Sequence, residues 1–209
     1  EIIDVRDDPR RKGKYSDILS EERARKGVTR ADAVRMLRSR TYFGSMMVAS
    51  DDADGLVGGI DRHYPDILRP CLHTIGTAPD VERLVGMYMM TIKGQLLFIG
   101  DATINIYPDS QTLAEIAIET AKMARRFGVK PVVAMLSFSN FGSSKEYRST
   151  RIEDAIKIVK ERDPSLIIDG PMQADTALVS DIQEEYPFMT FNCPANVLIC
   201  PNLAAANIG

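Results

Sequence analysis

The segment VVAMLSFSNFGSS, residues 132–144, gives the clearest indication of the fold. It opens with five apolar residues after Pro131, which is typical of a short buried strand, and then becomes a polar loop around Gly142. A helical pattern follows from about Ser149. This order of elements suits anion binding, because N–H groups of the loop and of the helix start can point at a ligand. The alternative is an ordinary strand–helix connection whose serines cap the backbone, since neither a Walker-type lysine nor a GxGxxG spacing is present.

Outward from this stretch, apolar runs alternate with helical patterns. We predict helices over 14–26, from 29, from 64, over 108–128, from 149 and over 171–186, a buried element over 84–90, and strands over 43–48, 95–99, 132–136, 166–168 and 197–200. Strands that alternate with helices of crossover length imply an α/β fold with a largely parallel sheet. Ligands in such folds gather at the carboxyl ends of the strands, which is where the loop 137–144 belongs.

Capping patterns mark several helix ends. Thr29 with Asp32 imitates a capping box, although aspartate replaces the usual glutamate. Thr112 with Glu115 has the spacing of a capping box, and Gly128 is placed to end the same helix.

Length and composition exclude several classes of protein. A chain of 209 residues with 44% apolar content can bury a real core, and its apolar runs are too short to cross a membrane. The three cysteines form no CxxC or Cys/His cluster, so we expect no zinc site, no disulfide scaffold and a reducing cytoplasm. We interpret His63 and His73 as a surface residue and a helix residue. Asp51, Asp52 and Asp54 lack the rest of an EF-hand loop and predict a solvated turn, so no metal site is expected.

Charge is distributed unevenly along the chain. Residues 1–40 carry 12 Lys and Arg against 8 Asp and Glu, so a region of charge +4 precedes a remainder of −7. Aromatic residues are not interleaved with these cations, and the calculated pI is about 5.5, so we expect no nucleic-acid partner. A solvated helical face, or a few arginines directed at a phosphorylated small molecule, fits this pattern better.

A series of motifs spread over nearly the whole chain, in one order, resembles the phosphate acetyl/butyryltransferase family: RKGVT, YFGSMMV, ADGLVGG, LRPCLHTIGTAP, DATINIYPDSQTLAEIAI, VAMLSFSNFGSS, IDGPMQADTAL and ANVLICPNLAAANIG. The resemblance implies a two-lobed α/β/α fold with largely parallel sheets, of the isocitrate/isopropylmalate dehydrogenase-like type. Residues 1–82 would belong to the first lobe and 83–209 to the second. The loop 137–144, called the serine loop below, would face the cleft between them. The chain would be a fragment whose lobes are completed by outside segments. The family's catalytic base, an aspartate, would lie beyond this sequence, so no catalytic residue is assigned.

Several positions depart from the active transacetylases. Asn140 and Phe141 stand where the family usually has Thr-Lys. Cys200-Pro201-Asn202 stands where it usually has an aromatic residue followed by Pro-Asp, and further departures fall at Arg62, Tyr64 and Ala206. These departures resemble the C-terminal domain of the large bacterial NADP-dependent malic enzymes, which is thought to sense acetyl-CoA. The resemblance implies acetyl-CoA as an effector, a homo-oligomer and a cytoplasmic location. NADP and a divalent metal would be bound only by the parent protein's other domain.

The resemblance also supplies candidate ligand-binding residues. Arg23 and Arg69 fall where the transacetylases carry arginines near the coenzyme A site, and an arginine fork suits phosphate groups. The alternatives are a helix-face charge for Arg23 and a structural ion pair for Arg69. The serine loop would contribute polar groups to a CoA or phosphate ligand from Ser139, Asn140, Gly142 and Ser143.

The residue at position 141 bears on the choice of function. A phosphate dianion in a transacylase benefits from a cation, and Phe141 supplies neither charge nor donor. We therefore expect a regulatory, acetyl-CoA-binding and oligomer-forming domain of a malic enzyme, whose parent decarboxylates malate to pyruvate. The alternatives are an active phosphate acetyl- or butyryltransferase, and an assembly domain with an empty cleft. Met87, Tyr88, Met89 and Met90 would suit a subunit contact, although such runs are more often buried in a core.

Overall fold

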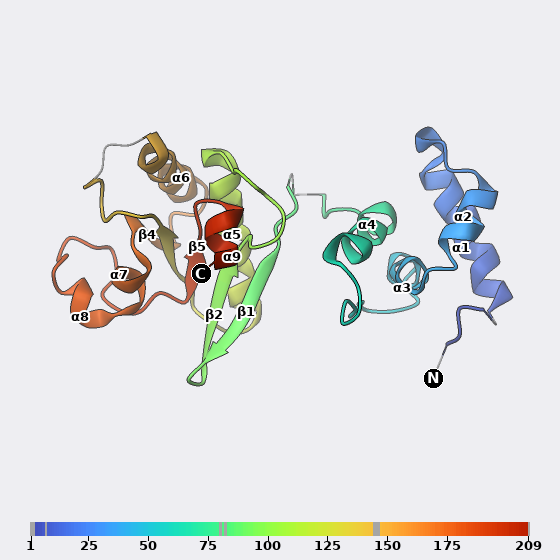
Figure 1. Ribbon diagram of the computed structural model, residues 1–209, viewed down its shortest axis with the longest axis horizontal. Coiled ribbons are helices and arrows are strands. Elements are labelled where there is room, and N and C mark those ends of the chain that lie inside the picture. The colour runs from blue at the N-terminus through green and yellow to red at the C-terminus, as the bar shows by residue number, and fades with distance from the viewer. Residues whose placement is uncertain (1–2, 7, 80, 82, 144–146, 209) are drawn as a thin grey trace. The chain divides into compact units, whose positions relative to one another are not determined.

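The computed structural model describes residues 3–6, 8–79, 81, 83–143 and 147–208, without the side chains of 147–149. The chain divides into two compact units, Glu1–Glu82 and Arg83–Gly209 (Figure 1). Whether outside segments complete these units into lobes stays a prediction. No helix in the described residues is both long and apolar enough to cross a membrane.

The first unit is helical. Its helices are α1 (Pro9–Glu22), the short 3₁₀ helix η1 (Ala24–Lys26), α2 (Arg30–Met36), α3 (Arg40–Ala49) and α4 (Tyr64–Thr74). The predicted capping box is present, because the Asp32 side chain accepts from the Thr29 N–H while Asp32 N–H donates to the Thr29 hydroxyl. The core of this unit is made by Tyr15, Leu19, Ala33, Leu37, Phe43 and Met46. Tyr15 packs edge-on to Phe43, and its hydroxyl donates to Asp52 at 2.6 Å.

The strand predicted over 43–48 is wrong, because these residues belong to helix α3. Phe43 and Met46 are three residues apart, and both are buried in the core of the first unit. A spacing of three places two side chains on one face of a helix, whereas a strand would direct them to opposite faces. Methionine also favours helices, and the glycines that follow at 55, 58 and 59 lie in a long loop.

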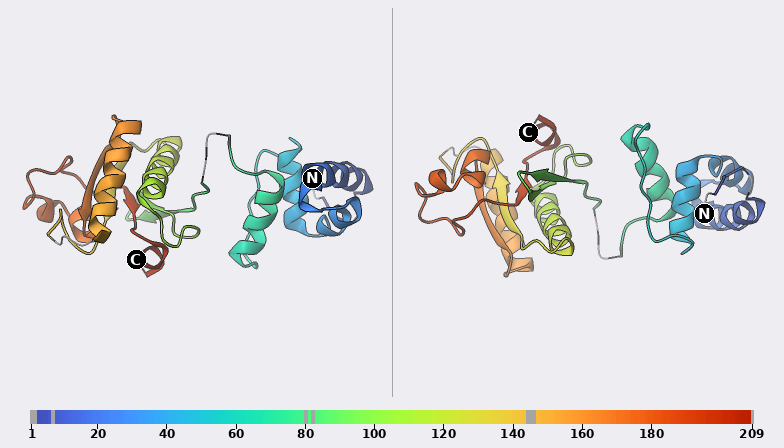
Figure 2. Two further views of the ribbon diagram at one scale, coloured as in Figure 1. Left: turned by 90° about the horizontal axis from the view of Figure 1, so that it is seen from above. Right: turned by 90° about the horizontal axis from the view of Figure 1, so that it is seen from below.

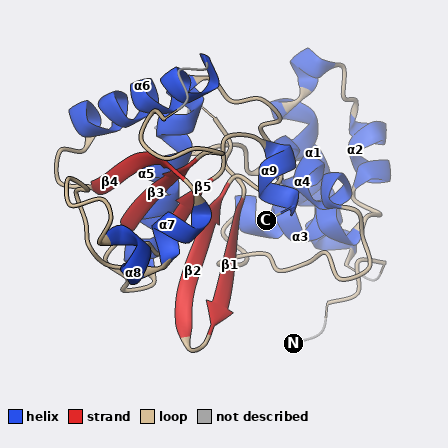
Figure 3. Cartoon of the chain, turned by 60° about the vertical axis from the view of Figure 1, so that its left-hand side comes forward, coloured by secondary structure: helices blue, strands red, loops and turns tan. Residues whose placement is uncertain are grey.

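The second unit is a sheet covered by helices. Its strands are β1 (Met87–Ile92), β2 (Gln95–Gly100), β3 (Val132–Leu136), β4 (Ile167–Met172) and β5 (Val197–Ile199). Its helices are α5 (Ser110–Arg126), α6 (Tyr147–Arg162), α7 (Ala174–Leu178), α8 (Ser180–Gln183) and α9 (Leu203–Ile208). The strand order is β1-β2-β5-β3-β4, and every neighbouring pair is parallel except β1 with β2 (Figure 3). The predicted α/β fold with a largely parallel sheet is confirmed.

Two apolar layers hold this sheet between helices. On one face, α5 and α6 lie side by side (Figure 2) and bury residues such as Leu113 and Val159 against Phe98 and Val133. On the other face, α7 and the segment before β5 cover a second cluster that includes Ala134, Ala177, Met172, Phe191 and Leu198. Alternate residues of one strand therefore face different helices, as the pleat of a strand requires.

Three local predictions are corrected in this unit. The element at 84–90 is the edge strand β1, shifted to Met87–Ile92, and Tyr88 and Met89 are 44% and 50% exposed. Helix α5 is capped by Asp109, whose carboxylate accepts from the Thr112 N–H, so Thr112 is not the cap. Residues 171–186 hold only the two short helices α7 and α8, because β4 continues through Met172.

Candidate functional site

The carboxyl ends of four parallel strands meet at one edge of the sheet. Strands β2, β5, β3 and β4 run in the same direction, so the segments after Gly100, Ile199, Leu136 and Met172 all leave from this edge. The serine loop, residues 137–143 in the described chain, is one of these segments. The prediction that this loop follows a buried strand at the carboxyl edge is confirmed.

The serine loop is fastened to the end of β4 by backbone hydrogen bonds. Ser137 N–H donates to the carbonyl oxygen of Met172 at 2.8 Å, and Phe141 N–H donates to that of Pro171 at 2.7 Å. Gly170 makes the approach of the two segments possible, because a Cβ there would lie 2.5 Å from the carbonyl oxygen of Met135. The serine loop and the end of β4 are therefore held together as one hydrogen-bonded substructure, called the interlock below.

Asn140 joins the same interlock through its side chain. Its Oδ1 accepts from the N–H of Gln173 at 2.7 Å, at the start of α7. Its Nδ2 donates to Oε1 of Gln173 at 3.1 Å and to the hydroxyl of Tyr186 at 3.2 Å. Both ends of the amide therefore have protein partners, which is the behaviour of a structural residue.

The remaining candidates in the loop differ in exposure. Ser139 is 8% exposed, and its hydroxyl oxygen is buried without a partner among the described residues. Ser143 is exposed, and its N–H donates to the carbonyl oxygen of Asn140 at 3.0 Å. Gly142 has φ +75°, a left-handed conformation that glycine adopts freely. The preceding Phe141 has φ +46°, which is unusual for a residue with a bulky side chain.

Phe141 packs into a group of three aromatic rings. Its ring centroid lies 5.1 Å from that of Tyr186 and 4.9 Å from that of Phe188, and the Phe188 contact is edge-to-face. It also packs against the apolar layer under α7. A hydrophobic contact therefore occupies the position where the resemblance expects a lysine side chain.

Arg151 is a cation at this edge that sequence reasoning missed. It lies on α6, and its Nη2 donates to the carbonyl oxygen of Pro201, just after β5, at 2.8 Å. Its Nε is buried without a partner among the described residues. Nothing in the sequence around Arg151, which lies about one turn into α6, indicates that its side chain reaches the end of β5.

In the first unit, the half-buried Arg23 and the exposed Arg69 both act electrostatically on one pair of rings. Tyr42 on α3 and His73 on α4 form a hydrogen bond of 2.7 Å between the hydroxyl and Nδ1, with ring centroids 5.9 Å apart. The positive charges of Arg23, at the end of α1, and Arg69, on α4, act on both rings. The sequence placed the two arginines 46 positions apart and gave no reason to link them to Tyr42 or His73.

The electrostatics of this group favour uncharged rings. Burial lowers the pKa of His73, and the charges of Arg23 and Arg69 lower it further. Burial raises the pKa of Tyr42, so its hydroxyl keeps its proton near neutral pH. Neither arginine forms an ion pair with a carboxylate among the residues described. The half-buried Arg23 also has an Nε that is buried and unpartnered within that set. The ion pair considered for Arg69 is therefore not found there.

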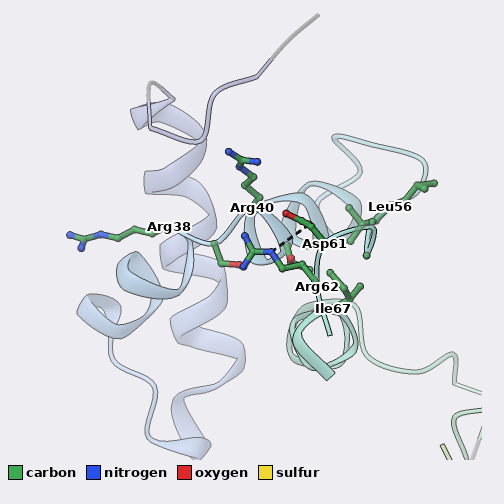
Figure 4. A pocket seen from close by; sticks show the side chains of 11 residues that line it. Arg38, Arg40, Leu56, Asp61, Arg62 and Ile67 are labelled. Atoms are coloured by element: carbon green, nitrogen blue, oxygen red, sulfur yellow. Dashed lines mark ion pairs between the residues drawn. The ribbon is translucent and has the colours of Figure 1, made fainter. Parts of the chain in front are cut away.

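The first unit also contains an open cavity of about 700 Å³, lined mainly by the start of α3, the two residues before it and the loop before α4. Arg38, Arg40 and Arg62 border it, together with Asp61, Leu56 and Ile67 (Figure 4). Arg62 pairs with Asp61 at 3.7 Å, and the side chains of Arg38 and Arg40 extend in different directions in Figure 4. These guanidinium groups do not converge, so the cavity is a weaker candidate than the group around His73.

No cluster of three or more metal-binding side chains occurs among the described residues. Asp52, from the predicted solvated turn, instead accepts from Tyr15 and Lys14. Burial raises the pKa of the Cys200 thiol to about 11, so this cysteine is protonated at neutral pH and is a poor nucleophile.

Comparison with known proteins identifies the class. The profile of the phosphate acetyl/butaryl transferase family matches residues 1–209. The EutD phosphotransacetylase from Staphylococcus aureus superposes with a TM-score of 0.82 and 40% identity, covering 94% of this chain and 61% of that one. A phosphotransacetylase from Streptococcus pyogenes gives a TM-score of 0.84 and 35% identity over 95% of this chain. The fold is that of a phosphotransacetylase.

The chain belongs to the phosphate acetyl/butyryltransferase family. It is 42% identical over 201 residues to the phosphate acetyltransferase of Bacillus subtilis (strain 168), covering 96% of this chain and 58% of that protein. It is 37% identical over 200 residues to the NADP-dependent malic enzyme of Rhizobium meliloti (strain 1021), covering 95% of this chain but 26% of that protein. The chain thus spans less than two thirds of the length of these relatives.

Proposed function

We propose that this chain is the acetyl-CoA-binding domain of a larger protein, and that it regulates this protein and does not transfer acyl groups. Arg23 and Arg69 would hold phosphate groups of the ligand, and the parent protein would be an NADP-dependent malic enzyme. Acetyl-CoA would act by binding one quaternary arrangement of a cytoplasmic homo-oligomer better than another, since an effector must distinguish two states. NADP and a divalent metal would be bound outside this chain.

The observation that supports ligand binding is that neither Arg23 nor Arg69 forms an ion pair with a carboxylate among the described residues. Arginine is rarely left without a carboxylate or other acceptor when it is partly buried, because its five donors need partners. Arg23 is half-buried and has a buried unpartnered Nε within the described chain. Arg69 is exposed and forms no ion pair there, so its guanidinium group is open to a ligand. Two guanidinium groups whose charges act on the same rings match the charge of a phosphate or diphosphate.

The observation that argues against acyl transfer is the aromatic packing around Phe141. Its ring is committed to contacts with Tyr186 and Phe188, and Asn140 beside it is bonded to Gln173. A developing negative charge at this loop would find no cation at position 141. Arg151 is a cation at the same edge of the sheet, but its Nη2 already donates a hydrogen bond to the carbonyl oxygen of Pro201.

A malic enzyme as the parent is supported by the relative from Rhizobium meliloti. That protein carries a segment 37% identical to almost all of this chain, and the segment makes up about a quarter of its length. The segment is therefore compatible with a large multidomain protein.

Calorimetric titration with acetyl-CoA tests the proposal. We expect saturable binding, and a loss of affinity of about 10- to 100-fold in Arg69→Gln, because one charge-assisted contact is removed. Arg25→Gln is the matched control, since Arg25 is an exposed cation in η1 that does not act on the ring pair. No binding at millimolar acetyl-CoA would contradict the proposal and favour an assembly domain with an empty cleft.

The second candidate function is an active phosphate acetyltransferase. It is favoured by the 42% identity to the enzyme of Bacillus subtilis, which exceeds the identity to the malic enzyme. The reaction would join the acyl group to phosphate and release CoA as a free thiol, or run in reverse. An assay that follows thiol release from acetyl-CoA and phosphate separates the candidates, since steady turnover would favour the transferase.

A further inference from the structure

The last part of the chain, residues 163–209, carries charge of one sign only. It contains six Asp and Glu and no Lys or Arg. Asp163 pairs with Arg125, and the carboxylate of Asp169 accepts from backbone N–H groups. The other four acidic residues are exposed and form no ion pair among the described residues: Asp175, Asp181, Glu184 and Glu185. Their charges are therefore free to attract a cation from outside this segment.

Two aromatic residues follow the last of these carboxylates. Tyr186 comes directly after Glu185, and Phe188 lies two positions further on. Their ring centroids are 6.0 Å apart, and both rings pack against Phe141 of the serine loop. Phe188 is nevertheless 65% exposed, so much of its ring is open to solvent. We call Glu184, Glu185, Tyr186 and Phe188 the acidic aromatic patch.

The acidic aromatic patch is held in place by buried hydrogen bonds. The hydroxyl of Tyr186 accepts from Nδ2 of Asn140 at 3.2 Å, and its N–H donates to the carbonyl oxygen of Gln183 at 2.9 Å. Gln183 is itself buried, and its Nε2 donates to the carbonyl oxygens of Thr176 and Ala177 in α7. Aromatic groups that are fixed before binding lose little conformational entropy when a partner arrives.

The chemistry of the acidic aromatic patch selects its ligand. A guanidinium group can stack on an aromatic ring and pair with a carboxylate at the same time, because it is planar and weakly hydrated. The ammonium group of lysine is more strongly hydrated and gains less from the ring. An anion would be repelled by Glu184 and Glu185, and an uncharged apolar partner would have to remove water from both carboxylates without compensation.

We propose that the acidic aromatic patch is a docking surface for an arginine-bearing segment of a partner protein, with a guanidinium group stacked on Phe188 and paired with Glu184 or Glu185. The proposal goes beyond the proposed function, since it uses neither the arginines of the first unit nor acetyl-CoA. Charge complementarity supports the choice of occupant, because residues 163–209 contain no cation to neutralise these carboxylates. The competing occupant is a second copy of this chain, whose residues 1–40 carry a charge of +4.

The test is a fluorescence anisotropy titration of a labelled peptide of alternating arginine and glycine with the protein at physiological ionic strength. A peptide of equal length with lysine in place of arginine measures the contribution of charge alone. We expect the arginine peptide to bind saturably, and about 2- to 5-fold more tightly than the lysine peptide, because of its contact with the ring. Equal affinities of the two peptides, or no saturable binding of the arginine peptide, would overturn the proposal.

A pair of aromatic variants tests the role of the ring. Phe188→Ala should abolish the preference for arginine over lysine. Phe127→Ala is the matched control, since Phe127 is 50% exposed at the end of α5 and follows two arginines instead of two carboxylates. It should leave both affinities unchanged. A preference for arginine that survives in Phe188→Ala would contradict the proposed contact, and amide resonances verify that each variant is folded.

A pair of charge variants tests the role of the carboxylates. Glu185→Gln should weaken the binding of both peptides by about 2- to 5-fold, because one exposed ion pair is lost. Glu161→Gln removes the same charge from an exposed position on α6, which covers the opposite face of the sheet from α7. Equal losses in the two variants would show that the overall charge, and not the acidic aromatic patch, attracts the peptide.

Light scattering of the protein without peptide distinguishes a partner protein from a second copy. Self-association that rises with concentration and disappears both in high salt and in Phe188→Ala would assign the acidic aromatic patch to a second copy and overturn the proposal. Self-association that persists in Phe188→Ala would leave the patch free for the partner. Binding of acetyl-CoA, measured separately by calorimetry, bears on the proposed function alone.

Discussion

The serine loop in the second unit and the ring pair in the first unit use polar residues in opposite ways. In the serine loop, the side-chain amide of Asn140 forms hydrogen bonds with Gln173 and Tyr186, and the loop backbone forms hydrogen bonds with the end of β4. Around the ring pair, Arg23 and Arg69 have no carboxylate partners among the described residues. A polar motif is evidence for a ligand only where its hydrogen-bonding groups are left over once the protein has folded.

The largest expected effect comes from breaking the interlock at Gly170. In Gly170→Ala, the new Cβ would lie 2.5 Å from the carbonyl oxygen of Met135, at a backbone φ of +141°. We expect the free energy of unfolding to fall by about 3 kcal/mol or more, because backbone cannot yield as a flexible side chain does. Chemical denaturation measures the loss.

Gly94→Ala is the matched control for this clash. Gly94 also has a positive φ, +81°, but a Cβ there meets nothing within 4 Å. It should cost about 1 kcal/mol, from the backbone conformation alone. Equal losses in the two variants would show that the contact between β3 and β4 is not the cause.

Asn140→Ala should have the next largest effect, and on stability more than on binding. The substitution leaves the N–H of Gln173 and the hydroxyl of Tyr186 without this partner, which should cost about 1–3 kcal/mol of unfolding free energy. Acetyl-CoA affinity, measured by calorimetry on the folded variant, should change less than twofold. An affinity loss as large as that of Arg69→Gln would mean that Asn140 is a ligand residue after all.

The smallest effect concerns pH. The pKa of His73 is lower in the folded protein than its usual value of 6.5, so the unfolded chain binds a proton more readily. Stability from this group is therefore complete above about pH 6.5 and is lost as the pH falls through the folded pKa. We expect the slope of unfolding free energy against pH between 7 and 5 to be smaller in His73→Gln than in the unaltered protein, as measured by chemical denaturation at a series of pH values; an equal slope would contradict this.

Sequence reasoning succeeded where a local pattern decides the structure. The apolar run at 132–136 and the alternation of strands and helices were sufficient to predict the α/β fold with its parallel sheet. The pattern failed at 43–48, because an apolar run of six residues does not by itself distinguish a strand from a helix whose face is set by Phe43 and Met46.

The candidate sites were predicted less completely than the fold. Arg23 and Arg69 were found through family resemblance, but the rings between them were not, since the contact of Tyr42 with His73 joins residues 31 positions apart. Arg151 was missed for the same reason, as its partner Pro201 is 50 positions away. Long-range contacts of single side chains leave no periodic signal in the sequence.

The most direct test of the central claim is ³¹P NMR of the full-length protein with acetyl-CoA and inorganic phosphate. The claim is that the anion site has been kept in a domain that does not transfer acyl groups. We predict that the phosphorus resonances of acetyl-CoA broaden in the presence of the protein, less so with Arg69→Gln, while no acetyl phosphate signal accumulates. Steady growth of the acetyl phosphate signal, or sharp acetyl-CoA resonances at every protein concentration, would contradict the claim.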